Sequence, residues 1–140
     1  KLLEKRLDGV RAVFLPPDVP LSLPDRFHLV VSSMTLHHVA DLASLFARLR
    51  DHLRPGGRVA LADLDREDGT FHDDAQGVVH LGFDRGQIAA LLVGAGFVDV
   101  AVETATVTRK GERSYPVFLA TGRRAEAASP ASRPEESSPG

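Results

Sequence analysis

Hydrophobic positions along the chain alternate between short strand-like runs and stripes with helical spacing. The run FHLVVSS at 27–33 is apolar and contains β-branched residues, which is typical of a strand covered on both faces. Between Asp41 and Leu53, leucines and a phenylalanine recur at helical spacing, which predicts a helix capped by Asp41 with one apolar stripe toward a sheet. Pro55 and the two following glycines are expected to end this helix, because glycine at a C-terminal cap accepts left-handed angles. RVALADL at 58–64 predicts the next buried strand.

These elements form a strand–helix–strand unit with parallel strands. After a long polar stretch, Asp84 and Gln87 resemble a capping box that starts a second helix, and the glycines at 94–96 end it. The alternating run at 98–108 and the apolar run at 115–122 then predict an antiparallel hairpin.

The beginning and the end of the chain differ from this middle part. VRAVFL at 10–15 predicts a strand that follows the end of a helix. The tail at 125–140 is rich in Ala, Ser, Pro and Glu and is expected to be disordered, because it cannot bury enough apolar surface to offset its ordering entropy. We therefore expect a folded portion over 1–124.

Composition excludes several classes of function. The formal net charge of −2 implies no general attraction to nucleic acid. The absence of cysteine removes disulfides and thiolate sites and fits a cytoplasmic protein. No apolar run reaches the roughly 18 residues of a membrane-spanning helix. The basic side chains near the end of the fold are interpreted as a solvated turn and terminus; they are Arg109, Lys110, Arg113, Arg123 and Arg124.

An ordered set of motifs gives the chain a family resemblance. PDRFHLVVSSMTLHHVADLASLFARLRDHLRPGGRVALADLD at 24–65 resembles the middle of class I S-adenosylmethionine (SAM)-dependent methyltransferases. DREDGTFH at 65–72, HLGFDR at 80–85 and GAGF at 94–97 resemble one small bacterial subgroup. The resemblance implies an α/β fold: a partial Rossmann-like sheet with helices on its faces and a C-terminal antiparallel hairpin.

The family's opening strand and its GxGxG-like loop have no counterpart in this sequence. We therefore expect the carboxyl-terminal portion of a methyltransferase domain, which binds cofactor poorly alone. Without its neighbours, strand 27–33 would expose an apolar edge, which favours a homodimer or pairing with 10–15. The alternative is a non-catalytic half-domain that pairs with a partner through this edge.

The resemblance implies SAM as cofactor and four positions that contact it. Asp18 and the backbone around Val19 would contact the adenine, whereas Ser33 and Met34 would lie against the methionine part. Ser33 and Met34 also lie at the carboxyl end of the predicted strand at 27–33, where ligands of open α/β sheets bind. The structural alternatives are a turn-forming aspartate after two prolines and an ordinary strand exit.

His37 and His38 are the first candidates for a general base, because a neutral imidazole accepts a proton near pH 7. A base is needed only if the methyl acceptor must lose a proton before it attacks the sulfonium methyl group. The alternative is that one histidine packs or caps the next helix while the other orients the loop.

The methyl acceptor is expected to be a small molecule held under a cover formed by the segment after 58–64, which would exclude water. Alternatives for this segment are a brace, a solvated loop, or a divalent-metal site made of its carboxylates and histidines; the spacing fits no metal template, and none is predicted. The candidate substrate-facing residues are Asp63, Phe71, His72, His80 and Phe83.

Overall fold

The computed structural model describes residue 23 and the ranges 26–71 and 78–126. The expected strand at 10–15, the helix end before it and most of the expected tail lie outside these residues. The described elements, in chain order, are strand β1 (Phe27–Ser33), the 3-10 turn η2 (Leu36–His38), helix α1 (Leu42–Asp51), strand β2 (Leu53–Leu64), helix α2 (Arg85–Gly94), strand β3 (Phe97–Lys110) and strand β4 (Arg113–Arg124).

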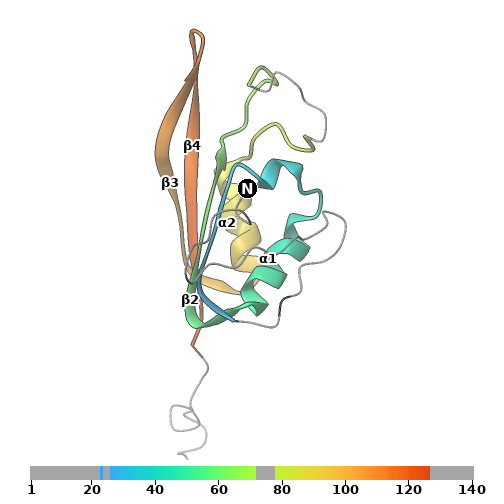
Figure 1. The fold of residues 1–140 in the computed structure, drawn as a ribbon, viewed down its shortest axis with the longest axis vertical. Helices are drawn as coiled ribbons and strands as arrows, with labels where there is room; N and C mark the ends of the chain where they lie inside the picture. The colour runs from blue at the N-terminus through green and yellow to red at the C-terminus, as the bar shows by residue number, and fades with distance from the viewer. Residues whose placement is uncertain (1–22, 24–25, 72–77, 127–140) are drawn as a thin grey trace, which may run out of the picture.

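The described strands form one sheet in the order β1-β2-β4-β3. β1 and β2 are parallel, with Val30 opposite Val59, and α1 is the crossover between them. β4 pairs antiparallel with both β2 and β3. The predicted strand–helix–strand unit, the hairpin and the α/β fold class are therefore confirmed in this part of the chain. Figure 1 shows the long β3–β4 hairpin reaching past the helices toward one end of the molecule.

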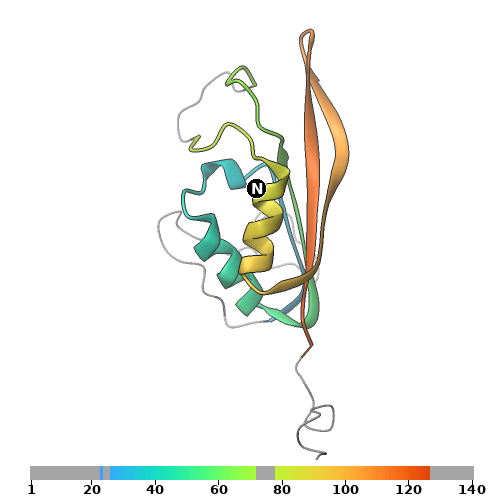
Figure 2. The ribbon, with the colours of Figure 1, turned by 180° about the vertical axis from the view of Figure 1, so that it is seen from behind.

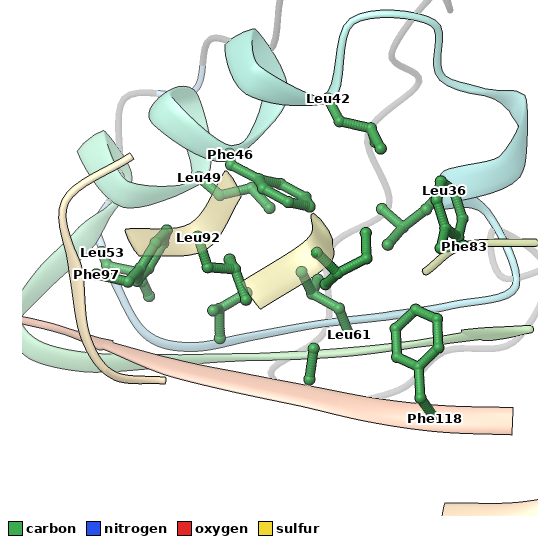
Figure 3. Close-up of a cluster of buried hydrophobic side chains, with 13 residues drawn as sticks. Leu36, Leu42, Phe46, Leu49, Leu53, Leu61, Phe83, Leu92, Phe97 and Phe118 are labelled. Carbon is green, nitrogen blue, oxygen red and sulfur yellow. The ribbon is translucent and has the colours of Figure 1, made fainter. Parts of the chain in front are cut away.

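Both described helices cover the same face of the sheet, as Figures 1 and 2 show from opposite sides. Their apolar stripes pack on side chains that alternate inward along the strands, since successive strand residues point to opposite faces. Phe46 of α1 and Leu92 of α2 meet Leu61 of β2 and Phe118 of β4, and all four are fully buried. In Figure 3, Phe83 and Phe118 lie at the same end of this cluster as Leu36.

Helix α1 begins as predicted but ends earlier. The Asp41 carboxylate accepts a hydrogen bond from the Ser44 amide at 3.1 Å, which satisfies an amide of the first turn. The helix ends at Asp51 and is capped by His52 in a right-handed conformation, so the prediction of a glycine cap was wrong. His52 replaces it because its ring Nδ1 donates to the Arg48 carbonyl at 2.7 Å, which occupies a carbonyl at the end of the helix.

Strand β2 accordingly starts at Leu53 and includes the two glycines, several residues before the predicted start at 58. Gly57 is required there because a Cβ would lie 2.9 Å from the Arg54 carbonyl oxygen and 3.0 Å from that of Phe27. The glycine therefore lets the beginning of β1 approach β2 closely.

Helix α2 is capped by Asp84, whose carboxylate accepts from the Gly86 amide at 2.9 Å. Among the hydrogen bonds of the described residues, none joins the Gln87 side chain to Asp84, so only half of the predicted capping box is seen. The helix ends near the predicted glycines, with Gly96 at a φ of +98°.

The sheet face away from the helices carries exposed apolar side chains on β1. Leu29 is 58% exposed and Val31 is 68% exposed. Within the described residues β1 is an edge strand, because the sheet order begins with it.

Candidate functional site

The carboxyl ends of β1 and β2 lie side by side because the two strands are parallel. Immediately after β1, Met34 has a φ of +59°, a left-handed conformation that is uncommon outside glycine. Its amide donates to the Ala62 carbonyl of β2 at 2.8 Å, which holds the exit turn on the neighbouring strand. Ser33 is exposed and Met34 is half-buried at this turn.

A buried histidine–aspartate pair fixes the next residues. Asp63 near the end of β2 is 0% exposed and His37 is 4% exposed. The ring Nδ1 of His37 lies 2.9 Å and 3.1 Å from the two carboxylate oxygens of Asp63. The same carboxylate accepts from the His37 amide at 3.2 Å and from the Leu64 amide at 2.8 Å. A carboxylate out of water needs such donors, and this one has three.

This arrangement decides the tautomer of His37. Because the Asp63 carboxylate is an acceptor, Nδ1 carries the hydrogen and Nε2 carries the lone pair of the neutral ring. His38 is exposed beside it, with the two ring centroids 4.3 Å apart. The two histidines that the sequence could not separate therefore have different surroundings.

His37 also holds the polar segment that begins at residue 78. Its carbonyl accepts from the Val79 amide at 2.7 Å and from the His80 amide at 3.1 Å. The His80 ring Nε2 in turn donates to the Val39 carbonyl at 2.9 Å. Asp63, His37 and His80 thus form a continuous network from β2 to the segment at 78–83.

Asp65, the residue after β2, anchors helix α2. Arg85 donates to Asp65 through Nε at 2.7 Å and through a terminal nitrogen at 3.0 Å, and it also donates to Thr104 of β3 at 2.9 Å. Hydrogen bonding to the Asp65 carboxylate raises the pKa of Arg85. Through Arg85, Asp65 therefore links the end of β2 to α2 and β3.

The segment at 66–71 folds onto the β3–β4 hairpin. The Thr70 hydroxyl lies 2.6 Å from the Tyr115 hydroxyl, and the Phe71 ring meets the Tyr115 ring edge-on with centroids 5.1 Å apart. Lys110 donates to the Phe71 carbonyl, and its ammonium lies over the Phe71 ring. Phe71 is therefore held by the hairpin, which rises beside this segment in Figures 1 and 2.

Four of the five basic side chains interpreted as a solvated turn and terminus also make specific contacts, although the Arg113 side chain is still 60% exposed. Arg113 pairs with Asp68 at 2.8 Å and Arg123 with Asp99 at 2.8 Å. Arg124 donates to the carbonyls of Arg50 and Leu53 at 3.1 Å and 2.7 Å. These pairings bring together residues far apart in the sequence, so local polarity could not reveal them.

An apolar cluster joins the exit turn to this segment. Leu64, Tyr115 and Val117 are buried, and Met34 and Phe71 pack against them. Met34, which was expected near the cofactor, and Phe71, which was expected near the substrate, therefore belong to one cluster. His80 and Phe83 lie elsewhere, on the wall of a cavity of about 240 Å³ beside α2.

The remaining site predictions have a simple status. Asp18, Val19 and His72 lie outside the described residues. In the part of the chain that the structure describes, no group of three or more His, Asp or Glu side chains could hold a metal ion. Sequence reasoning missed Arg85, Thr70 and Tyr115, because their partners are 19 to 45 residues away along the chain.

Comparison with known proteins gives the family. The family model described as "Methyltransferase domain" matches residues 8–102. The chain belongs to the methyltransferase domain family. The predicted family is therefore confirmed, whereas the bacterial subgroup stays a prediction.

Relatives of this methyltransferase chain include an uncharacterized methyltransferase of Schizosaccharomyces pombe, 42% identical over 55 residues, which are 39% of this chain and 19% of the relative. A SAM-dependent methyltransferase from Mesorhizobium loti is 26% identical, with a TM-score of 0.58 over 79% of this chain and 67% of that one. Phosphoethanolamine N-methyltransferase 2 of Haemonchus contortus, solved with phosphomonomethylethanolamine and S-adenosylhomocysteine, is 16% identical, with a TM-score of 0.58 over 74% of this chain and 34% of that one.

The chain thus spans about a fifth of its curated relative and a third of the Haemonchus enzyme. Within the described ranges of this methyltransferase chain, no helix has the length and apolar character needed to cross a membrane.

Replacing Asp63 by alanine is expected to lower the free energy of unfolding by about 3 kcal/mol or more, because three buried N–H donors lose their acceptor. Urea denaturation measures this change. Asp51→Ala is the matched control: Asp51 is 63% exposed, and its loss should change stability by less than about 0.5 kcal/mol. Equal stability of the two variants would contradict the role of the His37–Asp63 pair.

The carboxyl group of Asp68 is expected to titrate with a pKa of about 2, below the usual 3.8, because the Thr70 hydroxyl and the Arg113 guanidinium donate to its charged form. The contribution of the charged Asp68 side chain to folding stability is then fully present at a pH above its pKa in the unfolded chain. This contribution is lost as the pH falls through about 2. A ¹³C NMR titration of the carboxyl carbon measures this. Thr70→Val should raise the pKa, whereas Thr106→Val on the exposed part of β3 should leave it in place; no rise in Thr70→Val would refute the assignment.

Proposed function

We propose that this chain is the carboxyl-terminal portion, over 1–124, of a SAM-dependent methyltransferase domain. The observation that carries the proposal is the shared carboxyl end of the parallel strands β1 and β2, with its left-handed turn at Met34, in a chain that belongs to the methyltransferase domain family. Ligands of open α/β sheets bind at this edge. The cysteine-free composition supports a cytoplasmic location.

The described residues fit one wall of a SAM site. Ser33 offers an exposed hydroxyl and Met34 a partly buried apolar side chain at the same turn, which suits a ligand with both polar and aliphatic parts. In this proposal Ser33 and Met34 hold the methionine part, and Asp18 with the backbone at Val19 holds the adenine. The cofactor, when bound, supplies an electrophilic methyl group. Catalysis would then depend mainly on proximity and in-line orientation.

Within this proposal, the two histidines have separate roles. His37 is a positioning residue, because its Nδ1 is bound to Asp63 and its ring is almost fully buried. His38 is exposed beside it and is the candidate general base if the acceptor must lose a proton. Asp63, predicted to face the substrate, is fully buried and would act only by holding His37 in place.

The acceptor is proposed to be a small molecule beneath the segments at 65–72 and 80–83. Phe71 and Phe83 would supply apolar surface, and His72 and His80 polar contacts. The docking of 66–71 onto the hairpin supports this arrangement, since a cover must be held in place to exclude water.

Calorimetric titration with S-adenosylhomocysteine tests the cofactor assignment. We expect the chain alone to bind weakly, and the chain extended at its amino end by a segment with the family's GxGxG-like loop to bind well. In the extended protein, Met34→Ala should weaken binding roughly tenfold through lost apolar contact. Val93→Ala on the exposed side of α2 is the control and should have no effect. Binding by neither protein would refute the cofactor assignment and favour a non-catalytic module.

A homodimer through β1 is proposed as well, because this strand is the sheet edge of the described residues and carries the exposed Leu29 and Val31. The double variant Leu29→Glu/Val31→Glu should sediment as a monomer, since edge pairing would place like charges close together. Val93→Glu, at an equally exposed apolar position on α2, should leave the dimer intact. A wild-type chain that sediments as a monomer at high concentration would exclude the dimer.

A further inference from the structure

We infer that the cavity beside the start of α2 binds a small molecule that has a carboxylate group and an apolar body. We also infer that this small molecule is the methyl acceptor, anchored in the cavity by its carboxylate. The second half of this inference rests on the proposed function; the binding site itself does not. The cavity is lined by Leu42, Arg66, Val79, His80, Leu81, Gly82, Phe83 and Gln87.

The apolar part of the lining defines the body of the ligand. Four of the eight lining residues are the apolar side chains Leu42, Val79, Leu81 and Phe83. The volume of about 240 Å³ is below the usual range of roughly 300–1,000 Å³ for drug-sized ligands. The cavity therefore suits one small ring or a short aliphatic chain.

Two polar side chains define the charged end. In the described part of the chain, the Arg66 guanidinium and the side-chain amide of Gln87 have no hydrogen bond or ion pair to protein. Neighbouring carboxylates are engaged elsewhere, Asp65 by Arg85 and Asp84 by the Gly86 amide. A guanidinium binds a carboxylate through two parallel hydrogen bonds, which gives it preference over a neutral group.

The beginning of α2 adds to this preference. Gln87 lies in the first turn of the helix, where the helix dipole is positive. Gln87 and Arg66 face the same cavity, so an anionic group there would meet both. The helix end strengthens a site that the guanidinium already defines.

The wall is held in place by backbone pairing. The Arg66 amide donates to the Phe83 carbonyl, and the Phe83 amide to the Leu64 carbonyl, both at 3.0 Å. Gly82 makes this pairing feasible: its φ is +75°, and a Cβ would lie 2.0 Å from the Asp65 carbonyl oxygen. A preformed wall of this kind lowers the entropic cost of binding.

The cavity is also connected to the carboxyl end of β1 and β2, where methyl transfer is proposed. His80 and Val79, which line it, are bonded through their amides to the His37 carbonyl. Because the His80 Nε2 donates to Val39, the neutral ring presents Nδ1 as an acceptor. A ligand anchored by Arg66 would therefore lie next to the network that ends at Asp63.

NMR titration of the full ¹⁵N-labelled chain with benzoate, and separately with benzamide, tests the site without any cofactor. Benzoate should give saturable shifts at the lining residues. Arg66→Gln should weaken benzoate binding about tenfold or more, as expected for a charge-assisted contact. Leu81→Glu, at an exposed position of the wall, should abolish it. Arg54→Gln, which removes an exposed arginine at the other end of β2, should leave it unchanged.

Benzamide has the same shape and no charge, and it should bind at least about tenfold more weakly than benzoate. The inference is overturned if benzoate shows no saturable shifts at the lining, if Arg66→Gln binds as well as wild type, or if benzamide equals benzoate. These outcomes are independent of S-adenosylhomocysteine binding. Benzoate binding with failure of the cofactor titration would leave the carboxylate site standing and remove only its role in methyl transfer.

Discussion

The carboxylate of Asp63 constrains the whole carboxyl-terminal edge of the sheet. It is completely buried, and a charge out of water is very costly unless donors surround it. The amides of His37 and Leu64 and the ring of His37 supply these donors. The chain leaving β1 therefore has to place His37 over the end of β2. This one requirement sets the path of the exit turn and the position of η2.

Two further parts of the molecule are held close to this pair. The carbonyl of His37 holds the amides at 79 and 80, so the wall of the cavity near α2 is anchored to the carboxyl-terminal edge of the sheet. Asp65, two positions after Asp63, is bound by Arg85, and this ion pair joins α2 to the end of β2. Asp63 and Asp65, only two positions apart at the end of β2, thus hold different elements of the structure.

Much of the fold could be predicted, and the errors have physical causes. Caps at Asp41 and Asp84 depend on local hydrogen bonds, so their residue types were sufficient evidence. The end of α1 was misplaced because His52 caps the helix with its own ring, before the Pro-Gly-Gly sequence at 55–57 is reached. The second glycine, Gly57, instead allows β1 and β2 to approach closely. A glycine pair is ambiguous in sequence, since a left-handed cap and a close strand contact both require it.

The sequence by itself determined the order of strands and helices, the hairpin and the family, because periodicity, caps and motif order are local properties. Only the tertiary structure decided which candidate residues meet. His37 and Asp63 are 26 positions apart, and Thr70 and Tyr115 are 45 apart. Contacts between residues so far apart in the sequence depend on the order of the strands in the sheet. No local pattern of residues encodes this strand order. The separate surroundings of His37 and His38, and the cavity with Arg66 on its wall, follow from those contacts.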